Sequence, residues 1–133
     1  MTKFDSVQEE TVAGHVELKR FETPDEVRVF EKGRLAVLKI GGMVLGRAEY
    51  EPGWKWSVDV GPTVGALLCT VEHVGIVLAG TATVAFEDGR VVELTEGSAF
   101  HVPAVPHDSW VVGDRPYVSL HLMGADSYAR KQP

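Results

Sequence analysis

Short apolar runs alternate with turn residues along most of the chain from Leu35 onward. The runs are rich in valine, leucine, isoleucine and aromatic residues, and glycine, proline and aspartate separate them, which is typical of strands joined by turns. Between residues 81 and 86, Ala82, Val84 and Phe86 alternate with more polar positions, so one face of this run is apolar. The pattern predicts strands at Leu35–Ile40, Met43–Tyr50, Leu67–Ala79, Thr81–Phe86, Val91–Leu94, Ala99–Val102, Ser109–Val112 and Tyr117–Met123.

The turns between these runs favour an all-β fold. Asp88-Gly89 stands between two strand-like runs and predicts a tight hairpin. Many short strands at regular spacing are typical of a sandwich or a barrel. We therefore expect residues 35–125 to form one β-barrel, with residues 126–133 as a C-terminal tail.

The first 34 residues have a different, more polar pattern. Thr23-Pro24-Asp25-Glu26 has the form of a helix start, with a threonine cap, a proline in the first turn and a glutamate three residues after the cap. We expect residues 1–34 to form an irregular or partly helical extension that packs on the barrel.

Composition limits the partners and the location of the protein. The chain has 133 residues, which suits one domain, and its formal net charge is −6. An acidic protein is a poor partner for nucleic acid or an anionic membrane surface, so we expect neither. The N-terminus shows no apolar region of a signal peptide and no run is long enough to span a bilayer, so we expect a cytoplasmic protein. Cys69 is the single cysteine and has no partner for an internal disulfide.

Two spacings point to a known family. The first spacing begins at Gly61 and ends at Gly80. Five residues separate Gly61 from Leu67, one separates Leu67 from Cys69, three separate Cys69 from His73, and six separate His73 from Gly80. The second runs from Gly97 over five residues to Pro103 and then to His107.

These spacings resemble the two motifs of the cupin superfamily, G-x5-H-x-H-x3/4-E-x6-G and G-x5-P-x-G-x2-H-x3-N. In the first motif Leu67, Cys69 and His73 stand where cupins usually have two histidines and a glutamate. The second motif is one residue short, and His107 is the counterpart of its histidine. The segments 52–57 and 107–114 are similar to those of small single-domain bacterial cupins with a Cys-x3-His first motif. The resemblance implies a double-stranded β-helix, the cupin or jelly-roll barrel.

Cys69, His73 and His107 are the candidate metal ligands. Residues an even number apart on a strand share a face, so Cys69 and His73 can both point into the barrel, and the resemblance brings His107 beside them. A thiolate and two imidazoles with an open fourth position suit a catalytic zinc ion, and iron, copper, nickel or manganese are alternatives. The other interpretation is a buried core cysteine and hydrogen-bonded histidines in a cupin that binds no metal.

Aromatic and histidine side chains are the candidates for a substrate pocket. Trp54 and Trp56 follow a Pro-Gly turn, and Trp110 follows the second motif; they either line the mouth of the barrel or cap its core or a dimer interface. His121 shares a face of the last predicted strand with Ser119 and is expected in the cavity. His101 is a further pocket candidate, with a surface or hydrogen-bonding role as the alternative.

Two functions remain open at this stage. The first is a metal-dependent cupin enzyme acting on a small organic molecule as a lyase, isomerase, cyclase or dioxygenase, with Asp108 as a general base or as a partner of the ligand His107. The second is a non-catalytic domain that binds or senses a small ligand. Either one is expected to form a homodimer, since exposed sheet edges favour pairing.

Overall fold

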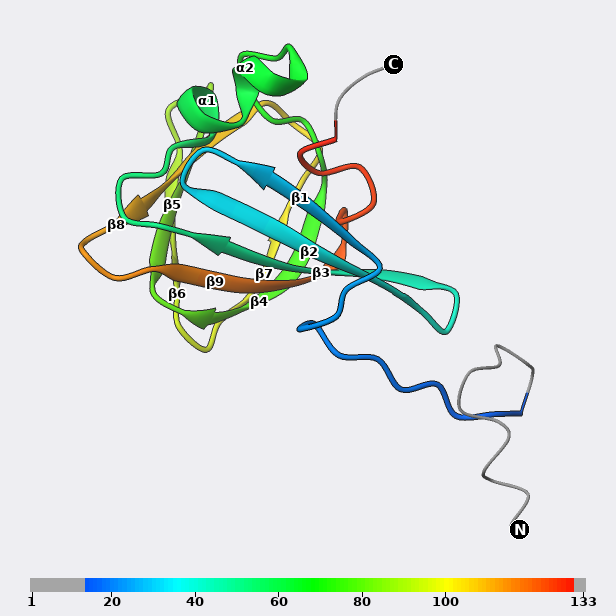
Figure 1. Ribbon diagram of the computed structural model, residues 1–133. Helices are drawn as coiled ribbons and strands as arrows, with labels where there is room; N and C mark the ends of the chain where they lie inside the picture. The colour runs from blue at the N-terminus through cyan, green and yellow to red at the C-terminus, as the bar shows by residue number, and fades with distance from the viewer. Residues whose placement is uncertain (1–13, 131–133) are drawn as a thin grey trace, which may run out of the picture.

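The computed structural model describes residues 14–130, which form two antiparallel sheets stacked into a barrel (Figure 1). The larger sheet has the strand order β1-β2-β3-β9-β4-β7, and the smaller has the order β6-β5-β8. The predicted all-β class and jelly-roll barrel are thereby confirmed. The strands are β1 (Glu26–Phe30), β2 (Gly33–Ile40), β3 (Met43–Tyr50), β4 (His73–Ala79), β5 (Thr81–Phe86), β6 (Val91–Thr95), β7 (Ala99–Val102), β8 (His107–Val112) and β9 (Tyr117–Met123).

The hydrophobic core lies between the two sheets. Leu35 and Val37 of β2 and Val77 of β4 are at most 1% exposed. Ala82 of β5 and Val111 of β8 belong to the same buried cluster and come from the smaller sheet. Each sheet thus turns one apolar face inward, as the alternation of apolar and polar positions predicts.

The hairpin predicted at Asp88-Gly89 is confirmed. It joins β5 to β6, which pair antiparallel. Gly89 has φ +95°, a backbone conformation that favours glycine. Asp88 also accepts a hydrogen bond from the backbone N–H of Arg90, which fixes the turn.

The helix predicted to start at Thr23 is wrong, because residues 26–30 form β1 and pair with β2. Asp25 does not enter a helical turn. Its carboxylate accepts a hydrogen bond from the backbone N–H of Lys39 at 2.7 Å, and its own N–H donates to the carbonyl of Val37 at 2.9 Å. Tertiary pairing with β2 therefore overrides the local cap pattern.

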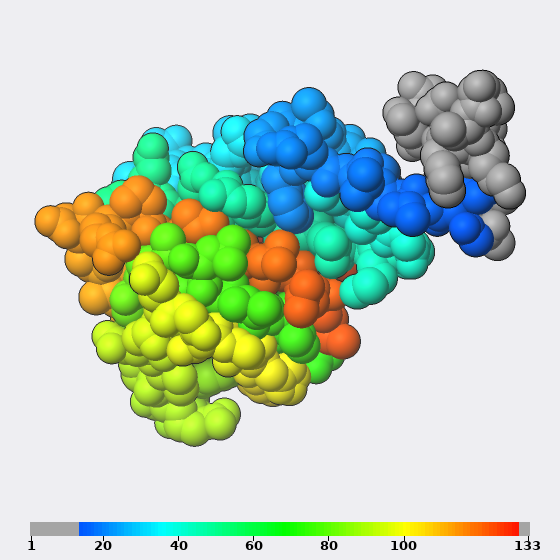
Figure 2. All heavy atoms as spheres, turned by 90° about the horizontal axis from the view of Figure 1, so that it is seen from below, coloured from blue at the N-terminus to red at the C-terminus, as the bar shows by residue number. Residues whose placement is uncertain are grey.

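The chain ahead of β1 lies along the hairpin between β2 and β3, blue against cyan in Figure 2. Glu17 accepts a hydrogen bond from the Gly41 N–H at 2.9 Å, and Lys19 donates to the Lys39 carbonyl at 2.6 Å. Residues 1–13 of the predicted extension and 131–133 of the predicted tail lie outside the described residues.

Two short helices, α1 (Trp56–Asp59) and α2 (Gly61–Val64), cover one end of the barrel between β3 and β4 (Figure 1). The strand predicted over 67–79 is shorter than expected and begins at residue 73, since the segment before it pairs with β8 only through one isolated bridge. Among residues 14–130, no helix has the length and apolar character needed to cross a membrane.

Candidate metal site in the barrel cavity

Cys69 and His107 are held together by the backbone. They form an isolated antiparallel bridge in which each N–H donates to the other's carbonyl, at 2.9 Å and 3.0 Å. His73 is the first residue of β4. Cys69 and His73 are buried while Thr70 and Glu72 between them are exposed, so the period of two expected from the sequence persists through this extended segment.

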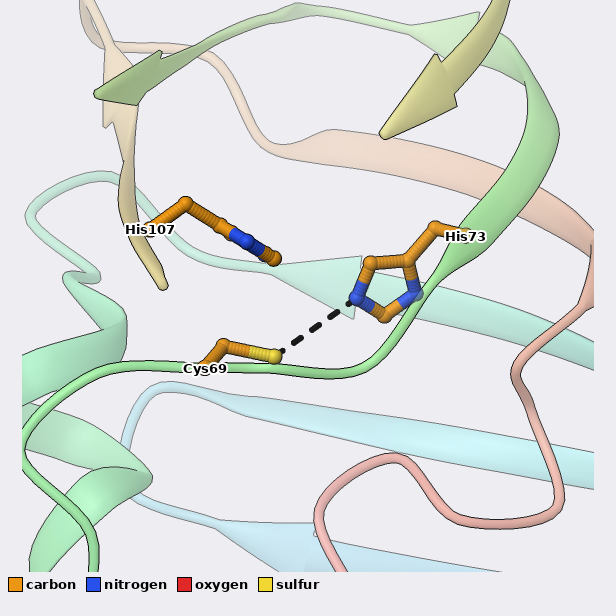
Figure 3. A group of neighbouring side chains, drawn as sticks. All are labelled: Cys69, His73 and His107. Carbon is orange, nitrogen blue, oxygen red and sulfur yellow. Dashed lines mark hydrogen bonds between the residues drawn. The ribbon is translucent and has the colours of Figure 1, made fainter. Parts of the chain in front are cut away.

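The three side chains converge on one point inside the barrel (Figure 3). Cys69 Sγ lies 3.7 Å from His73 Nε2. One ligand atom each from Cys69, His73 and His107 lies within 4.8 Å of the others. A tetrahedral zinc ion with ordinary bond lengths separates a bound sulfur from a bound nitrogen by about 3.6 Å, close to the observed distance.

The second ring nitrogen of His107 sets its tautomer. Nδ1 lies 2.8 Å from the carbonyl oxygen of Val105. Because a carbonyl only accepts, Nδ1 carries the hydrogen and donates, which leaves Nε2 of the neutral ring with a free lone pair. A metal-binding histidine is commonly held by such a hydrogen bond to a carbonyl oxygen.

Burial keeps the histidines of the cavity neutral, so their lone pairs are available to a cation. Burial lowers the pKa of His73 to about 2, with the nearby His121 and His107 adding to the effect, so its ring is neutral and free to bind metal. Burial raises the pKa of the Cys69 thiol to about 11. A bound cation has the opposite effect on the thiol pKa, because a thiol that coordinates a metal loses its proton. His73 turns Nε2 toward Cys69, and its Nδ1, on the other side of the ring, is buried without a partner among the described residues. The donor set therefore fits a divalent transition metal.

These ligands border a small cavity of about 40 Å³. This space has room for an ion with a few water molecules or for a ligand of a few heavy atoms. No carboxylate, lysine or arginine is among the described residues that line it. The lining residues are Tyr50, Trp54, Trp56, Cys69, His73, Ala82, Val84, Leu94, Phe100, Val102, His107, Ser109, Tyr117, Ser119, His121 and Tyr128.

His121, Trp54 and Trp56 are the pocket candidates that the structure brings to this cavity. The His121 ring lies 5.2 Å from that of His73, edge to face, and its Nε2 lies 3.0 Å from the Ser119 hydroxyl. Burial lowers the pKa of His121 to about 4, so this ring too is neutral near pH 7. Trp54 and Trp56 are both buried, and Trp56 is the first residue of α1.

Trp110 and His101 do not line the cavity. Trp110 is half-buried on β8, where the Lys55 ammonium lies 5.3 Å from the centre of its ring. His101 is exposed, and its Nε2 lies 2.7 Å from a carboxylate oxygen of Glu72. His101 thus takes the surface role that the sequence left as the alternative.

Asp108 does not reach the cavity either. Its carboxylate accepts hydrogen bonds from the Ser57 N–H at 3.0 Å and the Ser57 hydroxyl at 2.7 Å, and Lys55 lies 3.8 Å away. These contacts tie α1 to β8 next to His107. The structure therefore supports a role for Asp108 in positioning these elements and gives no support to its predicted role as a general base.

Three tyrosines also line the cavity, and none of them was predicted as a site residue from the sequence. Tyr50, Tyr117 and Tyr128 are all at most 5% exposed. Tyr117 lies two residues before Ser119 on the inward face of β9, so the period of two already contained that signal. Tyr128 follows the last strand, in the predicted tail, and no periodicity indicates it.

The family model described as "Cupin domain" matches residues 54–123. No curated protein matches the chain.

Several solved structures share the fold. A protein of unknown function from Rhizobium leguminosarum is 18% identical, with a TM-score of 0.52 over 69% of this chain and 80% of that one. A sugar phosphate isomerase from Silicibacter pomeroyi is 16% identical, with a TM-score of 0.52 over 72% of this chain and 68% of that one. An oxalate decarboxylase from Lactobacillus farciminis is 18% identical, with a TM-score of 0.52. The match covers 74% of this chain but only 30% of that chain.

Proposed function

Because this chain belongs to the cupin domain family, we propose that it is a metal-dependent domain that acts on a small organic molecule inside its barrel. Cys69, His73 and His107 are the proposed metal ligands. The proposal includes the cytoplasmic location predicted from the sequence, which cell fractionation tests.

The convergence of the three ligand atoms within 4.8 Å in a buried cavity carries the proposal. Three neutral or ionisable donors of this kind leave room for a water or a substrate atom at a fourth position. The thiolate favours a transition metal, zinc first, with iron, copper, nickel or manganese as alternatives, over magnesium or calcium.

A metal bound here supplies a Lewis acid that polarises a carbonyl or enolate, or that activates water or dioxygen. The chain itself orients His107 through Val105 and surrounds the ligands with aromatic side chains that exclude bulk water. Lyase, isomerase, cyclase and dioxygenase reactions all suit such a site. Two structurally similar proteins, an isomerase and a decarboxylase, perform reactions of the first two classes.

The alternative function is a non-catalytic domain that binds or senses a small ligand. Two observations favour it. No carboxylate or amine that could move a proton is among the described residues that line the cavity, and Asp108 hydrogen-bonds to Ser57 outside it. Cys69→Ser and His107→Ala variants separate the two functions. Ligand binding that survives loss of the metal supports the binding domain, and ligand binding that disappears with the metal supports the metal-dependent site.

Metal content tests the proposed function. We expect nearly one transition-metal ion per chain in the purified protein, and about a tenth of that or less in a His73→Ala variant, because a ligand has been removed. Plasma mass spectrometry of both proteins measures this. His101→Ala is the matched control, since His101 is an exposed histidine outside the cavity. Equal and negligible metal in wild type and His73→Ala, even after reloading, contradicts the proposal.

The outer edge of the larger sheet is the proposed contact of a homodimer. β1 is the edge strand, and its Val27 and Val29 are 41% and 77% exposed. We expect twice the chain mass in analytical ultracentrifugation, and the monomer mass for Val29→Lys, because a lysine on an edge strand opposes pairing. Val91→Lys on β6, the edge of the smaller sheet, is the control. If Val91→Lys dissociates the dimer and Val29→Lys does not, the dimer contact is not at β1.

A further inference from the structure

The turn that follows β9 closes the cavity from the C-terminal side. Residues 124–130 leave the sheet at Gly124, which has φ +96°, and Ala129 has φ +55°, a conformation that alanine rarely adopts. Between them, Tyr128 turns back into the barrel, where it is 3% exposed and lines the cavity. A residue beyond the last strand thus fills part of the space beside the proposed metal ligands.

The Tyr128 ring occupies a defined place in that space. Its hydroxyl lies 2.6 Å from the Tyr50 hydroxyl. The ring lies 5.2 Å from His73, edge to face, and 5.9 Å from His121, nearly parallel to it at 13°. It is therefore a planar ring with one hydrogen-bonding oxygen, set directly against a proposed metal ligand.

Arg28 holds the turn in place. One nitrogen of its guanidinium donates to the carbonyl oxygens of Ala125 at 2.8 Å and Tyr128 at 2.7 Å. Glu26 binds the other side of the guanidinium at 2.7 Å, and the Arg28 side chain is only 10% exposed. The hydrogen bonds between the turn and β1 thus come from one charged side chain and not from a strand ladder.

The same turn also borders a second hollow. It has a volume of about 140 Å³, and Ser127, Ala129 and Arg130 of the turn form part of its wall. It shares Cys69 and Trp56 with the inner cavity. The turn therefore borders both hollows, and displacing it opens a path from the surface to Cys69.

We propose that residues 124–130 form a lid latched by Arg28, and that a ligand reaches the cavity by displacing the Tyr128 ring. In the metal-free protein, the ligand that takes this place is small, planar and uncharged and carries one hydrogen-bonding oxygen, because no charged side chain is among the described residues that line the cavity. This inference rests on the proposed use of the cavity as a binding site, but its test needs no metal, so the two can fail separately.

Alkylation of the single cysteine tests the lid in metal-free protein. Cys69 is 2% exposed, so a small neutral thiol reagent, methyl methanethiosulfonate, reacts only after an opening. Local opening exposes little surface, so we expect the labelling rate, followed by intact mass, to be nearly independent of urea below about 1 M. We expect Arg28→Ala to raise that rate about tenfold or more, since charge-assisted hydrogen bonds to two carbonyls are lost.

Arg47→Ala is the matched control. Arg47 of β3 also pairs with a glutamate two residues away on its own strand, Glu49 at 2.9 Å, and among the described residues it makes no hydrogen bond to the turn. We expect wild-type labelling in this variant. The lid is overturned if wild-type labelling follows urea with the full slope of global unfolding, or if Arg28→Ala and Arg47→Ala change the rate equally.

The ligand class is tested in Tyr128→Ala, or in Tyr128→Leu if the alanine variant fails to fold. Phenol and benzoate share a ring, but benzoate carries a negative charge, and the described residues that line the metal-free cavity include no lysine or arginine to pair with it. We expect millimolar phenol to slow Cys69 labelling and benzoate at the same concentration to leave it unchanged. Equal effects of the two compounds overturn the proposed ligand class.

Discussion

Replacing Trp54 by alanine is expected to lower the free energy of unfolding by about 3–5 kcal/mol, because a large buried side chain leaves a cavity behind. Trp54 is 1% exposed, and its ring stacks on Tyr50 at a centroid distance of 3.8 Å and an angle of 2°. The backbone carbonyl of Trp54 also accepts a hydrogen bond from Val111 of β8 at 3.0 Å. This residue therefore joins the two sheets at the end of the barrel that carries the proposed metal site.

Trp110→Ala is the matched control, with an expected loss of about 1 kcal/mol or less, since its ring is half-buried and contacts Lys55 at the surface. Urea unfolding followed by circular dichroism measures both variants. Trp54→Phe is expected to lose less than Trp54→Ala, because it keeps an aromatic ring and removes an indole N–H that has no hydrogen-bond partner within residues 14–130. Equal stability of the Trp54→Ala and Trp110→Ala variants contradicts the role assigned to Trp54.

The convergence of Cys69 and His73 was predictable because it depends on a local property of the chain. Extended backbone turns every second side chain to the same side, and this holds for residues 69–73 although only His73 lies in a strand. The position of His107 depends on a long-range bridge to Cys69, which no periodicity shows. Its place came from the family resemblance alone.

The course of β1 was not predictable from local pattern. Thr23, Pro24 and Glu26 satisfy the rules of a helix start, yet the pairing of β1 with β2 decides the structure. Val27 and Val29 alternate as strand residues do, but five residues are too few for the period of two to outweigh the cap.

The direction of individual side chains explains the remaining differences between the predicted site and the observed one. His101 and Asp108 lie in or beside the second motif, so the sequence placed them near the cavity, while the structure directs them to Glu72 and Ser57. Tyr128 lies beyond the last strand, and its burial depends on the contacts of Arg28 with the turn. Such contacts between distant parts of the chain leave no trace in local hydrophobic periodicity.

Cys69→Ser is the substitution with the largest expected effect on metal binding, because it removes the thiolate. Cys69→Ser keeps the size of the side chain and replaces a soft donor by a hydroxyl that binds zinc poorly. We expect zinc affinity, measured by competition with a chromophoric chelator, to fall about a hundredfold or more. His121→Gln is the control, because His121 lies in the same cavity and is not one of the three converging ligands.

X-ray absorption at the zinc edge of the zinc-loaded protein tests the proposed site most directly. The three converging side chains predict one sulfur at about 2.3 Å and nitrogen neighbours at about 2.0–2.1 Å, with the sulfur absent in Cys69→Ser. A zinc ion surrounded only by nitrogen and oxygen in the wild-type protein, or the same spectrum from both proteins, contradicts the assignment of Cys69 as a ligand.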